Sequence, residues 1–573
     1  MQPSPQVGAG VAVGVGVLVV AAACAGAAGC RRTSLLPRSD GAAVVVATAP
    51  LPGDKDVSFV PEVEPNDGLA TAQKIAFDAA LAPAGINGRL EPAAGAHHDV
   101  DLFRLVIPPP PSPNAGADHP GDASAAVVLR RRLSVTVEPE PALAVQVDAL
   151  DDQGQSLIAA AGAAAGETEG FPNLTVTPGT YFVRVRAAGN AGASGGYRLV
   201  ARLAPLEIGE ESEPNGKAAL ATEAPATGEV VGYHGWHHDQ DWYRLPLAAV
   251  PEGSVLGVDL EAVPGVTASL LVFDAAERKL VESRGRPEER VAVRNVKLPG
   301  GDPQLFVVVR TDGGRNAGVR YHLRLRAELP RTGSELEPND DAAHAQVIAD
   351  GETLGYLGRG DVDVYRYPAP ATPAELDIEL TPPERVDARL EILRETDGLL
   401  LVRADAGKRH EAEHIPNLFS PGGGALLIRL SAGKGDGNAD EPYHLTISSR
   451  APEPGAEREP NGATATATAL PAGVTGNGLI YPRGDVDVWK TPLPAGAAGA
   501  TVTVAGIAGL TLEVRVLADD ERELGRFKVG GPTPTPFTVT TGGAACCLVQ
   551  VRDGSPKAAA ANAADRYSLT VAP

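Results

Sequence analysis

The same three-part pattern occurs four times along the chain, and it limits the possible folds more than any other feature. Each copy starts with Glu-x-Glu-Pro-Asn, continues with Asp-x-Asp-x-aromatic, and closes in a strand-like segment rich in Tyr or Val. The starts span residues 62–66, 211–215, 335–339 and 457–461. A repeat at a spacing of roughly 120–150 residues predicts four domains of ordinary size with one architecture.

The repeat also sets the expected domain boundaries. We expect an N-terminal signal at 1–30 and a linker at 31–60, followed by repeats at 61–205, 208–328, 332–450 and 455–573. The first repeat is longer because of a Pro-, Gly- and Ala-rich segment at 108–126, which is typical of an exposed loop.

Within each repeat, short runs of alternating apolar and polar residues indicate β-strands. In the second repeat the expected strands are 255–260, 268–273, 290–296, 305–310 and 321–326; in the first they are 133–137, 143–150, 181–186 and 197–203. No stretch has an extended helical period. The sequence therefore predicts an all-β fold of four tandem, jelly-roll-like antiparallel β-sandwiches.

Charge excludes one class of partner. The formal net charge is −22, whereas a nucleic-acid-binding surface needs clustered Lys and Arg. The apolar content of 43% indicates folded domains rather than a disordered chain. An acidic surface suits either cation binding or plain solubility.

The N-terminus indicates export. An apolar run at 11–23 is followed by Ala27, Ala28, Gly29 and Cys30, which resembles a bacterial lipoprotein signal whose cysteine becomes the lipidated first residue. Cys24 is a second candidate for lipidation. Because no Lys or Arg precedes the apolar run, an uncleaved anchor also stays open. We expect a cell-surface or outer-membrane lipoprotein, or a periplasmic or extracellular protein, that meets a membrane only through this segment.

The remaining cysteines, Cys546 and Cys547, are adjacent and give no disulfide framework. Since neighbours on a strand face opposite ways, we expect Cys547 to pack inward beside Val549 and Val551. A vicinal disulfide is the alternative.

The repeated acids suit calcium. The residue before a proline is extended, so Glu62 and Glu64 should point to the same side, and Asn66 and the following Asp67 should turn the chain. If the strand that starts near Asp101 packs beside them, up to six oxygen-bearing side chains converge. Calcium takes 6–8 oxygen ligands. The alternative is a polar linker turn followed by an ordinary strand start.

The motifs resemble a known family. Together with the segment 179–185 and the late Tyr197, Tyr321, Tyr443 and Tyr567, they are similar to the bacterial pre-peptidase C-terminal domain and the related collagen-binding domains of secreted clostridial collagenases. The resemblance covers nearly all of the chain beyond residue 60. It implies a jelly-roll β-sandwich that accompanies secreted enzymes and holds calcium through its acidic motifs. With aromatic residues at 4%, a collagen-gripping surface is not identifiable.

The resemblance carries candidate calcium ligands onto all four repeats. They are Glu62, Glu64, Asn66, Asp67, Asp99 and Asp101; Glu211, Glu213, Asn215, Asp239 and Asp241; Glu335, Glu337, Asn339, Asp340, Asp361 and Asp363; and Glu457, Glu459, Asn461, Asp485 and Asp487. Repeats 2 and 4 have Gly216 and Gly462 after the Asn, so each lacks one oxygen. We therefore expect the best sites in repeats 1 and 3.

Two motifs look catalytic. His410, Glu411 and His414 match the zinc-peptidase pattern His-Glu-x-x-His, which works only on a helix, where residues four apart share a face. Aligned on the repeats, this segment falls on a turn and a strand, so we expect coincidence. The segment 192–196 matches a serine nucleophile elbow but lacks the following helix.

Histidines cluster before two of the acidic pairs, as His97 and His98 and as His234, His237 and His238. They suggest a transition-metal site or a pH-tuned calcium site. We favour a solvated polar loop.

These observations predict a non-catalytic exported array of calcium-stabilised β-sandwiches for binding, adhesion or spacing at the cell envelope. Its partner would be an extracellular polymer or protein that the sequence does not identify. Two alternatives stay open: a secreted metallopeptidase that uses the His410 motif, and a structural stalk that binds no ligand.

Overall fold

The computed structural model describes residues 35–37, 43–45, 57–77, 80–92, 98–109, 130–189, 193–207, 209–301, 303–555 and 560–573. The chain divides into two units, Met1–Asp56 and Val57–Pro573. In the first unit, β1 (Leu35–Pro37) pairs antiparallel with β2 (Ala43–Val45). The expected signal at 1–30, with Cys24 and Cys30, lies outside the described residues. Among the described residues, no helix is long and apolar enough to cross a membrane.

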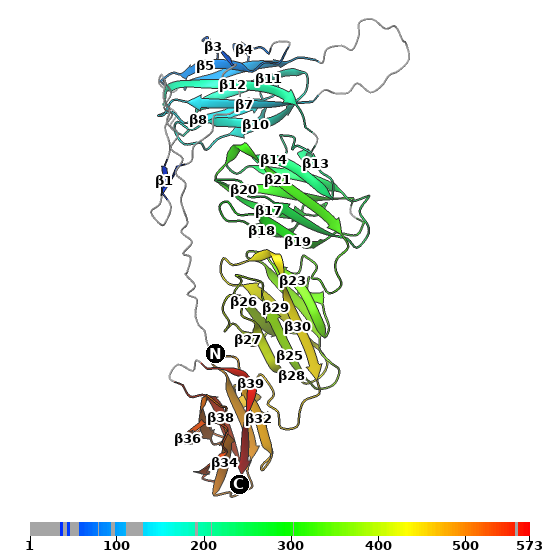
Figure 1. The fold of residues 1–573 in the computed structure, drawn as a ribbon, viewed down its shortest axis with the longest axis vertical. Helices are drawn as coiled ribbons and strands as arrows, with labels where there is room; N and C mark the ends of the chain where they lie inside the picture. The colour runs from blue at the N-terminus through cyan, green and yellow to red at the C-terminus, as the bar shows by residue number, and fades with distance from the viewer. Residues whose placement is uncertain are drawn as a thin grey trace, which may run out of the picture. The chain divides into compact units, whose positions relative to one another are not determined.

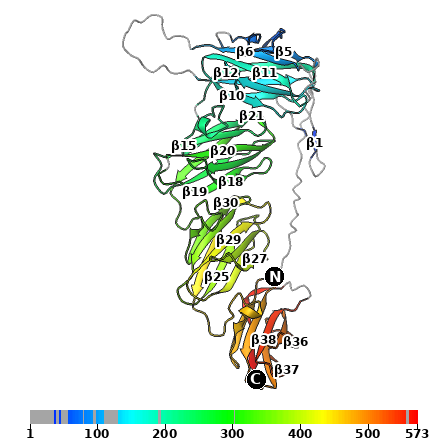
Figure 2. The ribbon, with the colours of Figure 1, turned by 180° about the vertical axis from the view of Figure 1, so that it is seen from behind.

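In the second unit each repeat forms two β-sheets, and we call the four pairs of sheets modules 1 to 4. Figure 1 draws each module as its own group of strands, and the same groups are seen from behind in Figure 2. The only helical segments among the described residues are the short 3-10 turns η2 (Ala218–Leu220) and η3 (Thr464–Thr466). The predicted all-β fold of tandem β-sandwiches is confirmed.

Module 1 contains β3 (Ser58–Pro61), β4 (Gln73–Ile75), β5 (Ala84–Leu90), β6 (Val100–Ile107), β7 (Arg131–Pro139), β8 (Val145–Leu150), β9 (Ser156–Ala160), β10 (Glu169–Val176), β11 (Gly179–Ala187) and β12 (Gly195–Pro205). Its sheets have the strand orders β10-β7-β12-β5-β3 and β4-β6-β11-β8-β9. Most of β3 lies in the range expected as linker, yet it pairs in parallel with β5.

Module 2 contains β13 (Thr222–Glu223), β14 (Gly228–His234), β15 (Gln240–Pro246), β16 (Val255–Leu260), β17 (Thr267–Phe273), β18 (Lys279–Arg284), β19 (Val291–Lys297), β20 (Gln304–Gly313) and β21 (Asn316–Glu328). Its sheets run β13-β15-β20-β17-β18 and β14-β21-β16-β19. Five of these strands, β16, β17, β19, β20 and β21, agree with the predicted ones to within a few residues at each end.

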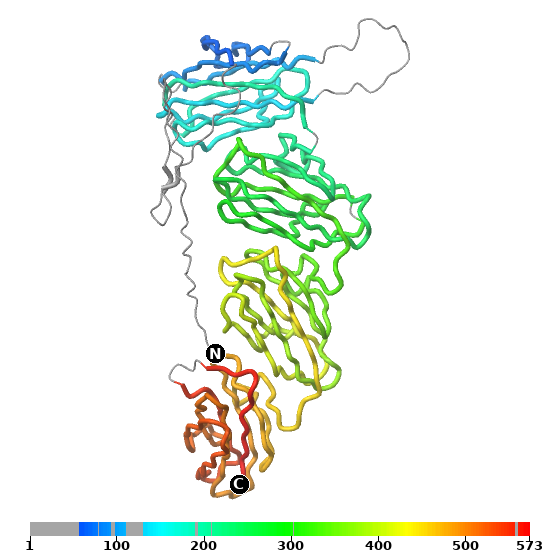
Figure 3. Tube along the Cα trace, viewed as in Figure 1, coloured from blue at the N-terminus to red at the C-terminus, as the bar shows by residue number. Residues whose placement is uncertain are grey.

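Modules 3 and 4 repeat this order. Module 3 contains β22 (Gln346–Val347), β23 (Gly351–Leu357), β24 (Val362–Pro368), β25 (Ala374–Thr381), β26 (Ala388–Arg394), β27 (Leu400–Ala404), β28 (Glu413–Ser420), β29 (Ala425–Ala432) and β30 (Asn438–Arg450). Module 4 contains β31 (Thr468–Ala469), β32 (Thr475–Ile480), β33 (Val486–Pro492), β34 (Gly499–Ala505), β35 (Thr511–Leu517), β36 (Glu523–Gly530), β37 (Thr535–Thr540), β38 (Cys546–Asp553) and β39 (Asn562–Ala572). Figure 3 follows the chain through these strands.

Each module has its own core between its two sheets. Alternating residues of each strand face inward, as in β7, where every second residue from Arg131 to Pro139 is buried. Leu199, Leu323, Leu445 and Leu569, on the closing strands β12, β21, β30 and β39, are fully or almost fully buried in four separate apolar clusters. The modules are therefore separately packed.

Candidate metal centres

The Glu-x-Glu segment and the strand-start aspartate come together in every module. One carboxylate oxygen from each of three residues lies within 4.8 Å of the other two. The trios are Glu62, Glu64 and Asp101; Glu211, Glu213 and Asp241; Glu335, Glu337 and Asp363; and Glu457, Glu459 and Asp487. The predicted convergence is thus present four times, with three carboxylates at its centre instead of six side chains.

Local hydrogen bonds hold the glutamates in place. In each module the backbone N–H of the asparagine donates to the carboxylate two residues before it, as Asn339 does to Glu337 at 2.9 Å. The first glutamate accepts another backbone N–H from the strand beside it; for Glu335 the donor is Tyr356 at 2.7 Å. The peptide bond before each motif proline is cis.

A tyrosine from the closing strand reaches each trio. Tyr321 donates to Asp241 at 2.6 Å, Tyr567 donates to Asp487 at 2.7 Å, and Tyr197 donates to Asp101. Tyr443 donates to Glu335 at 3.2 Å instead. The sequence pattern predicts these tyrosines only as strand residues. The signal that links them to the site is that one tyrosine recurs in the closing strand of every repeat that carries the acidic motif.

A glycine faces each of these tyrosines across the sheet. The cross-strand pairs are Tyr197 with Gly88, Tyr321 with Gly232, Tyr443 with Gly355 and Tyr567 with Gly478. A Cβ atom at Gly355 would lie 2.2 Å from the Tyr443 hydroxyl and 2.2 Å from Glu335 Oε2. Because glycine has no side chain, the tyrosine hydroxyl and the glutamate carboxylate can approach each other at this position.

The trios contain buried oxygens that have no partner. Asp101 Oδ1, Asp241 Oδ1, Asp487 Oδ1 and both carboxylate oxygens of Asp363 are buried without a hydrogen bond. The Oδ1 atoms of Asn66, Asn215, Asn339 and Asn461 are also buried and unpartnered. Buried polar atoms are nearly always satisfied, so these oxygens, at four equivalent places, are free to accept a positively charged ligand.

Burial shifts the acids toward their neutral forms. Desolvation raises the pKa of Asp101 to about 9, of Glu211 to about 7 and of Glu457 to about 8. For Asp363 desolvation and then the charge of Glu335 raise the pKa well above its ordinary value. Without a bound cation, the raised pKa values favour the protonated, neutral forms of these carboxyl groups.

The aspartates before the strand lie beside the trios. Asp99, Asp239, Asp361 and Asp485 each accept a backbone N–H from the preceding segment, at 2.5, 2.7, 2.9 and 2.9 Å. Only in module 3, among the described residues, does this aspartate join a second trio, formed by Glu337, Asp340 and Asp361. Asp67, the counterpart of Asp340, is exposed and outside the trio of module 1.

A neighbouring module contributes to two of the sites. Asn173 on β10 donates to Glu211, and Asn417 on β28 donates to Glu457. Asn173 Oδ1 has no partner. Sequence reasoning missed both residues, although each follows a proline in the equivalent segments Phe171–Leu174 and Ile415–Leu418.

The other motifs do not form sites of this kind. His410 lies in a turn with a φ of 68°, and His414 lies on β28, where its Nε2 is 2.9 Å from Asp377 Oδ1. The prediction of a turn and a strand is confirmed, and the two histidines do not share a helix face. The candidate serine elbow begins at Gly192, which is outside the described residues.

The preference for a solvated histidine loop was wrong at His234. This side chain is 1% exposed, its Nδ1 is 2.7 Å from Thr311 Oγ1, and burial lowers its pKa to about 4. None of the metal-capable groups among the described residues includes a histidine. His97 lies outside the described residues, and His98 is exposed.

The two C-terminal cysteines are both free and buried. Cys547 packs in the module 4 core with Val549 and Val551, as predicted, while Cys546 packs in a smaller cluster with Val488 and Leu548.

Fold and sites together define a class: a tandem array of β-sandwich modules, each with an acidic cluster that includes a buried aspartate. No protein-family profile matches the chain, and no curated protein matches it by sequence. Among solved structures, it is similar at 9% identity and a TM-score of 0.14 to the CUB1-EGF-CUB2 domain of human MASP-1/3, over 39% of this chain and 100% of that one. A biofilm-associated protein BSP domain matches at 11% identity and a TM-score of 0.12, over 75% of this chain and 89% of that one. The M60 catalytic domain with CBM51 domains from Clostridium perfringens ZmpB matches at 9% identity and a TM-score of 0.13, over 42% and 35%.

Proposed function

We propose that this chain is a non-catalytic array of β-sandwich modules, stabilised by calcium, that serves binding, adhesion or spacing outside the cell. The observation that carries the proposal is the carboxylate trio with unpartnered buried oxygens, which occurs in all four modules. Hard oxygen donors of this kind suit calcium, which prefers carboxylates and amide oxygens.

The residues that would hold each ion are the trio and the asparagine that follows it. In module 3 the two trios share Glu337, so this module offers a second, overlapping position. A bound cation would supply the positive charge that these carboxylates otherwise replace with protons. It would thereby raise the stability of the folded state by mass action.

The test is thermal unfolding of the full chain with calcium, with magnesium and with a chelator, together with calorimetric titration of calcium. We expect calcium to raise the unfolding midpoint clearly more than magnesium, because magnesium demands a tighter octahedral shell. Unfolding midpoints that are equal in calcium and in chelator, with no heat of binding, would contradict the proposal.

Export and tethering belong to the same proposal and are supported by the N-terminal apolar run with its small residues before Cys30, or Cys24. We expect Cys30→Ser to move the protein from the membrane to the soluble fraction in a bacterial host, with Cys24→Ser as the matched variant. If neither substitution releases the protein, it is held by an uncleaved anchor and not by lipid.

A further inference from the structure

A polar cleft lies where module 2 meets module 3, apart from the acidic trios. Its volume is about 250 Å³, and it is lined by the β18–β19 segment of module 2 and, in module 3, by two loops and the start of β30. Four arginines line it, Arg284, Arg290, Arg359 and Arg385, against three acids, Glu289, Glu384 and Asp440. This excess of positive charge stands out in a chain whose formal charge is −22.

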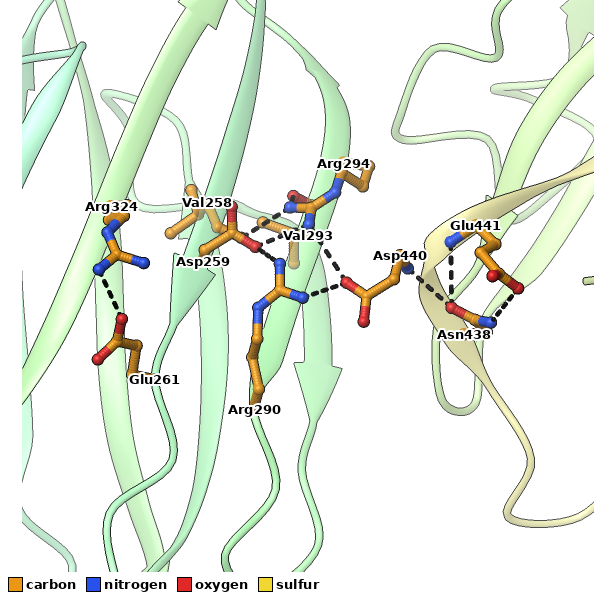
Figure 4. Close-up of polar contacts among 10 residues, drawn as sticks. All are labelled: Val258, Asp259, Glu261, Arg290, Val293, Arg294, Arg324, Asn438, Asp440 and Glu441. Atoms are coloured by element: carbon orange, nitrogen blue, oxygen red, sulfur yellow. Dashed lines mark hydrogen bonds and ion pairs between the residues drawn. The ribbon is translucent and has the colours of Figure 1, made fainter. Parts of the chain in front are cut away.

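Three of the arginines are engaged in building the walls. Arg290 binds both Asp259 of its own module and Asp440 of module 3, as Figure 4 shows. Arg359 pairs with Glu289 across the junction at 2.9 Å, and Arg284 pairs with Glu282 at 2.9 Å. Their charges are largely satisfied by the protein.

Arg385 differs from the other three. It is exposed, it lines the cleft, and it makes no hydrogen bond or ion pair with any residue that the structure describes. Its guanidinium presents a planar fork of donors that matches a carboxylate.

The backbone at Arg385 is also strained. The turn between β25 and β26 is closed by Val386 N–H donating to Pro383 O at 3.3 Å, and Arg385 occupies it with a φ of 66°. The equivalent turns of modules 2 and 4 place Gly265 and Gly509 there, with φ values of 77° and 79°. A side chain at a left-handed position costs stability where glycine does not, and such strain is concentrated at functional sites.

We propose that this cleft binds a uronic-acid unit of an acidic polysaccharide, with Arg385 as the anchor for the sugar carboxylate. The cleft is slightly smaller than ordinary ligand pockets of roughly 300–1,000 Å³, so it suits one sugar ring and not a folded protrusion. Its lining is mainly polar, with the Ser283 hydroxyl and the backbone at Gly437 available to ring hydroxyls. An apolar peptide side chain would instead call for an apolar lining.

The experiment is calorimetric titration of the full chain with trigalacturonate at low ionic strength. A chelator is present throughout, so that the result does not depend on the acidic trios or on calcium. We expect binding that weakens as salt rises. Arg385→Gly should weaken it at least about tenfold, because a charge-assisted bond is lost. Glycine suits this turn, so the variant should keep or raise its unfolding midpoint. Arg483→Ala, on the exposed counterpart of Arg359 in module 4, is the matched control and should bind normally.

Neutral galactotriose and the peptide triglutamate separate the alternatives. Negligible binding of both supports a uronate site. The proposal is overturned if trigalacturonate does not bind, if Arg385→Gly binds it as tightly as the unaltered chain, or if galactotriose or triglutamate binds equally well.

Discussion

Asp363 illustrates what a single residue contributes to these sites. It is fully buried, neither carboxylate oxygen has a hydrogen-bond partner, and Glu335 lies beside it. A neutral amide of nearly the same shape would remove the charge while keeping the packing. The substitution Asp363→Asn therefore separates repulsion between acids from affinity for a cation.

We expect Asp363→Asn to leave the unfolding midpoint in chelator unchanged or higher, because no charge has to be buried. In calcium the variant should lose part of the calcium-induced rise in the unfolding midpoint, since one of the four sites is impaired. Differential scanning fluorimetry measures both effects. Asp341→Asn, at an exposed neighbour of the same site, is the control and should keep the full calcium response.

The raised pKa values set a pH dependence. In the folded, cation-free protein Asp361 has a pKa of about 6, Glu211 of about 7 and Glu457 of about 8, while the unfolded chain releases these protons near pH 4. The folded state therefore holds more protons between about pH 4 and 8, so cation-free stability falls as pH rises through this window.

Calcium competes with those protons, so the midpoint difference between calcium and chelator should grow from pH 5 to pH 8. Melting curves across this range provide the measurement. A difference that is constant with pH, or that shrinks as pH rises, would contradict the assignment of the ions to these carboxylates.

At the scale of elements, the glycine of one strand and the tyrosine of the next form a unit. On β23 and β30, Gly355 gives Tyr443 the space to reach Glu335. Any side chain at the glycine must displace one of the two polar groups from the site.

Gly355→Ala should therefore destabilise module 3 by about 1–3 kcal/mol, as overpacking of a closed core does. It should also weaken calcium binding there, which calorimetric titration would show as one weakened site. Gly257→Ala on β16 is the matched control, because a Cβ there meets nothing within 4 Å. Equal effects of the two substitutions would mean that the close approach has no role.

Strands could be predicted from the sequence where one face of the strand is buried and the other is more exposed. Strand β7 is an example: buried and half-buried residues alternate along its whole length, so the alternation was readable. The edge strand β18, with the sequence Lys-Leu-Val-Glu-Ser-Arg, was missed; it is mostly half-buried or exposed. An edge strand carries charge on both faces, which erases the periodic signal.

The candidate sites were predictable in part for a related reason. The Glu-x-Glu and Asp-x-Asp motifs are local and repeated, so their convergence could be inferred from the extended backbone before proline. The contributions of Tyr321 and Asn173 depend on strand register and on contact between modules. Strand register and contact between modules cannot be read from the spacing of residues within a motif.

For the whole molecule, four separate cores imply four units of unfolding, because each core lies within one module. Ile378→Ala, in the core of module 3, should cost about 2–5 kcal/mol. Hydrogen exchange read by mass spectrometry should show the loss of protection confined to module 3. Leu399→Ala, at a residue that is 51% exposed in the same module, should change little. Loss of protection spread over all modules would argue against independent cores.

The tyrosine contacts also make two of the sites optically distinct. In module 4 the buried Trp489 donates from Nε1 to Tyr567 at 2.6 Å, and Tyr567 donates to Asp487. Module 2 holds Trp242, directly after Asp241, and Trp236; these complete the chain's three tryptophans. Module 3 therefore has no tryptophan of its own, whereas Trp236 also packs against the core of module 1. Tryptophan fluorescence would report calcium binding at the trios of modules 2 and 4. Tyrosine absorbance would report binding in all four modules. Together the two signals would give the order in which the sites bind calcium, without any label.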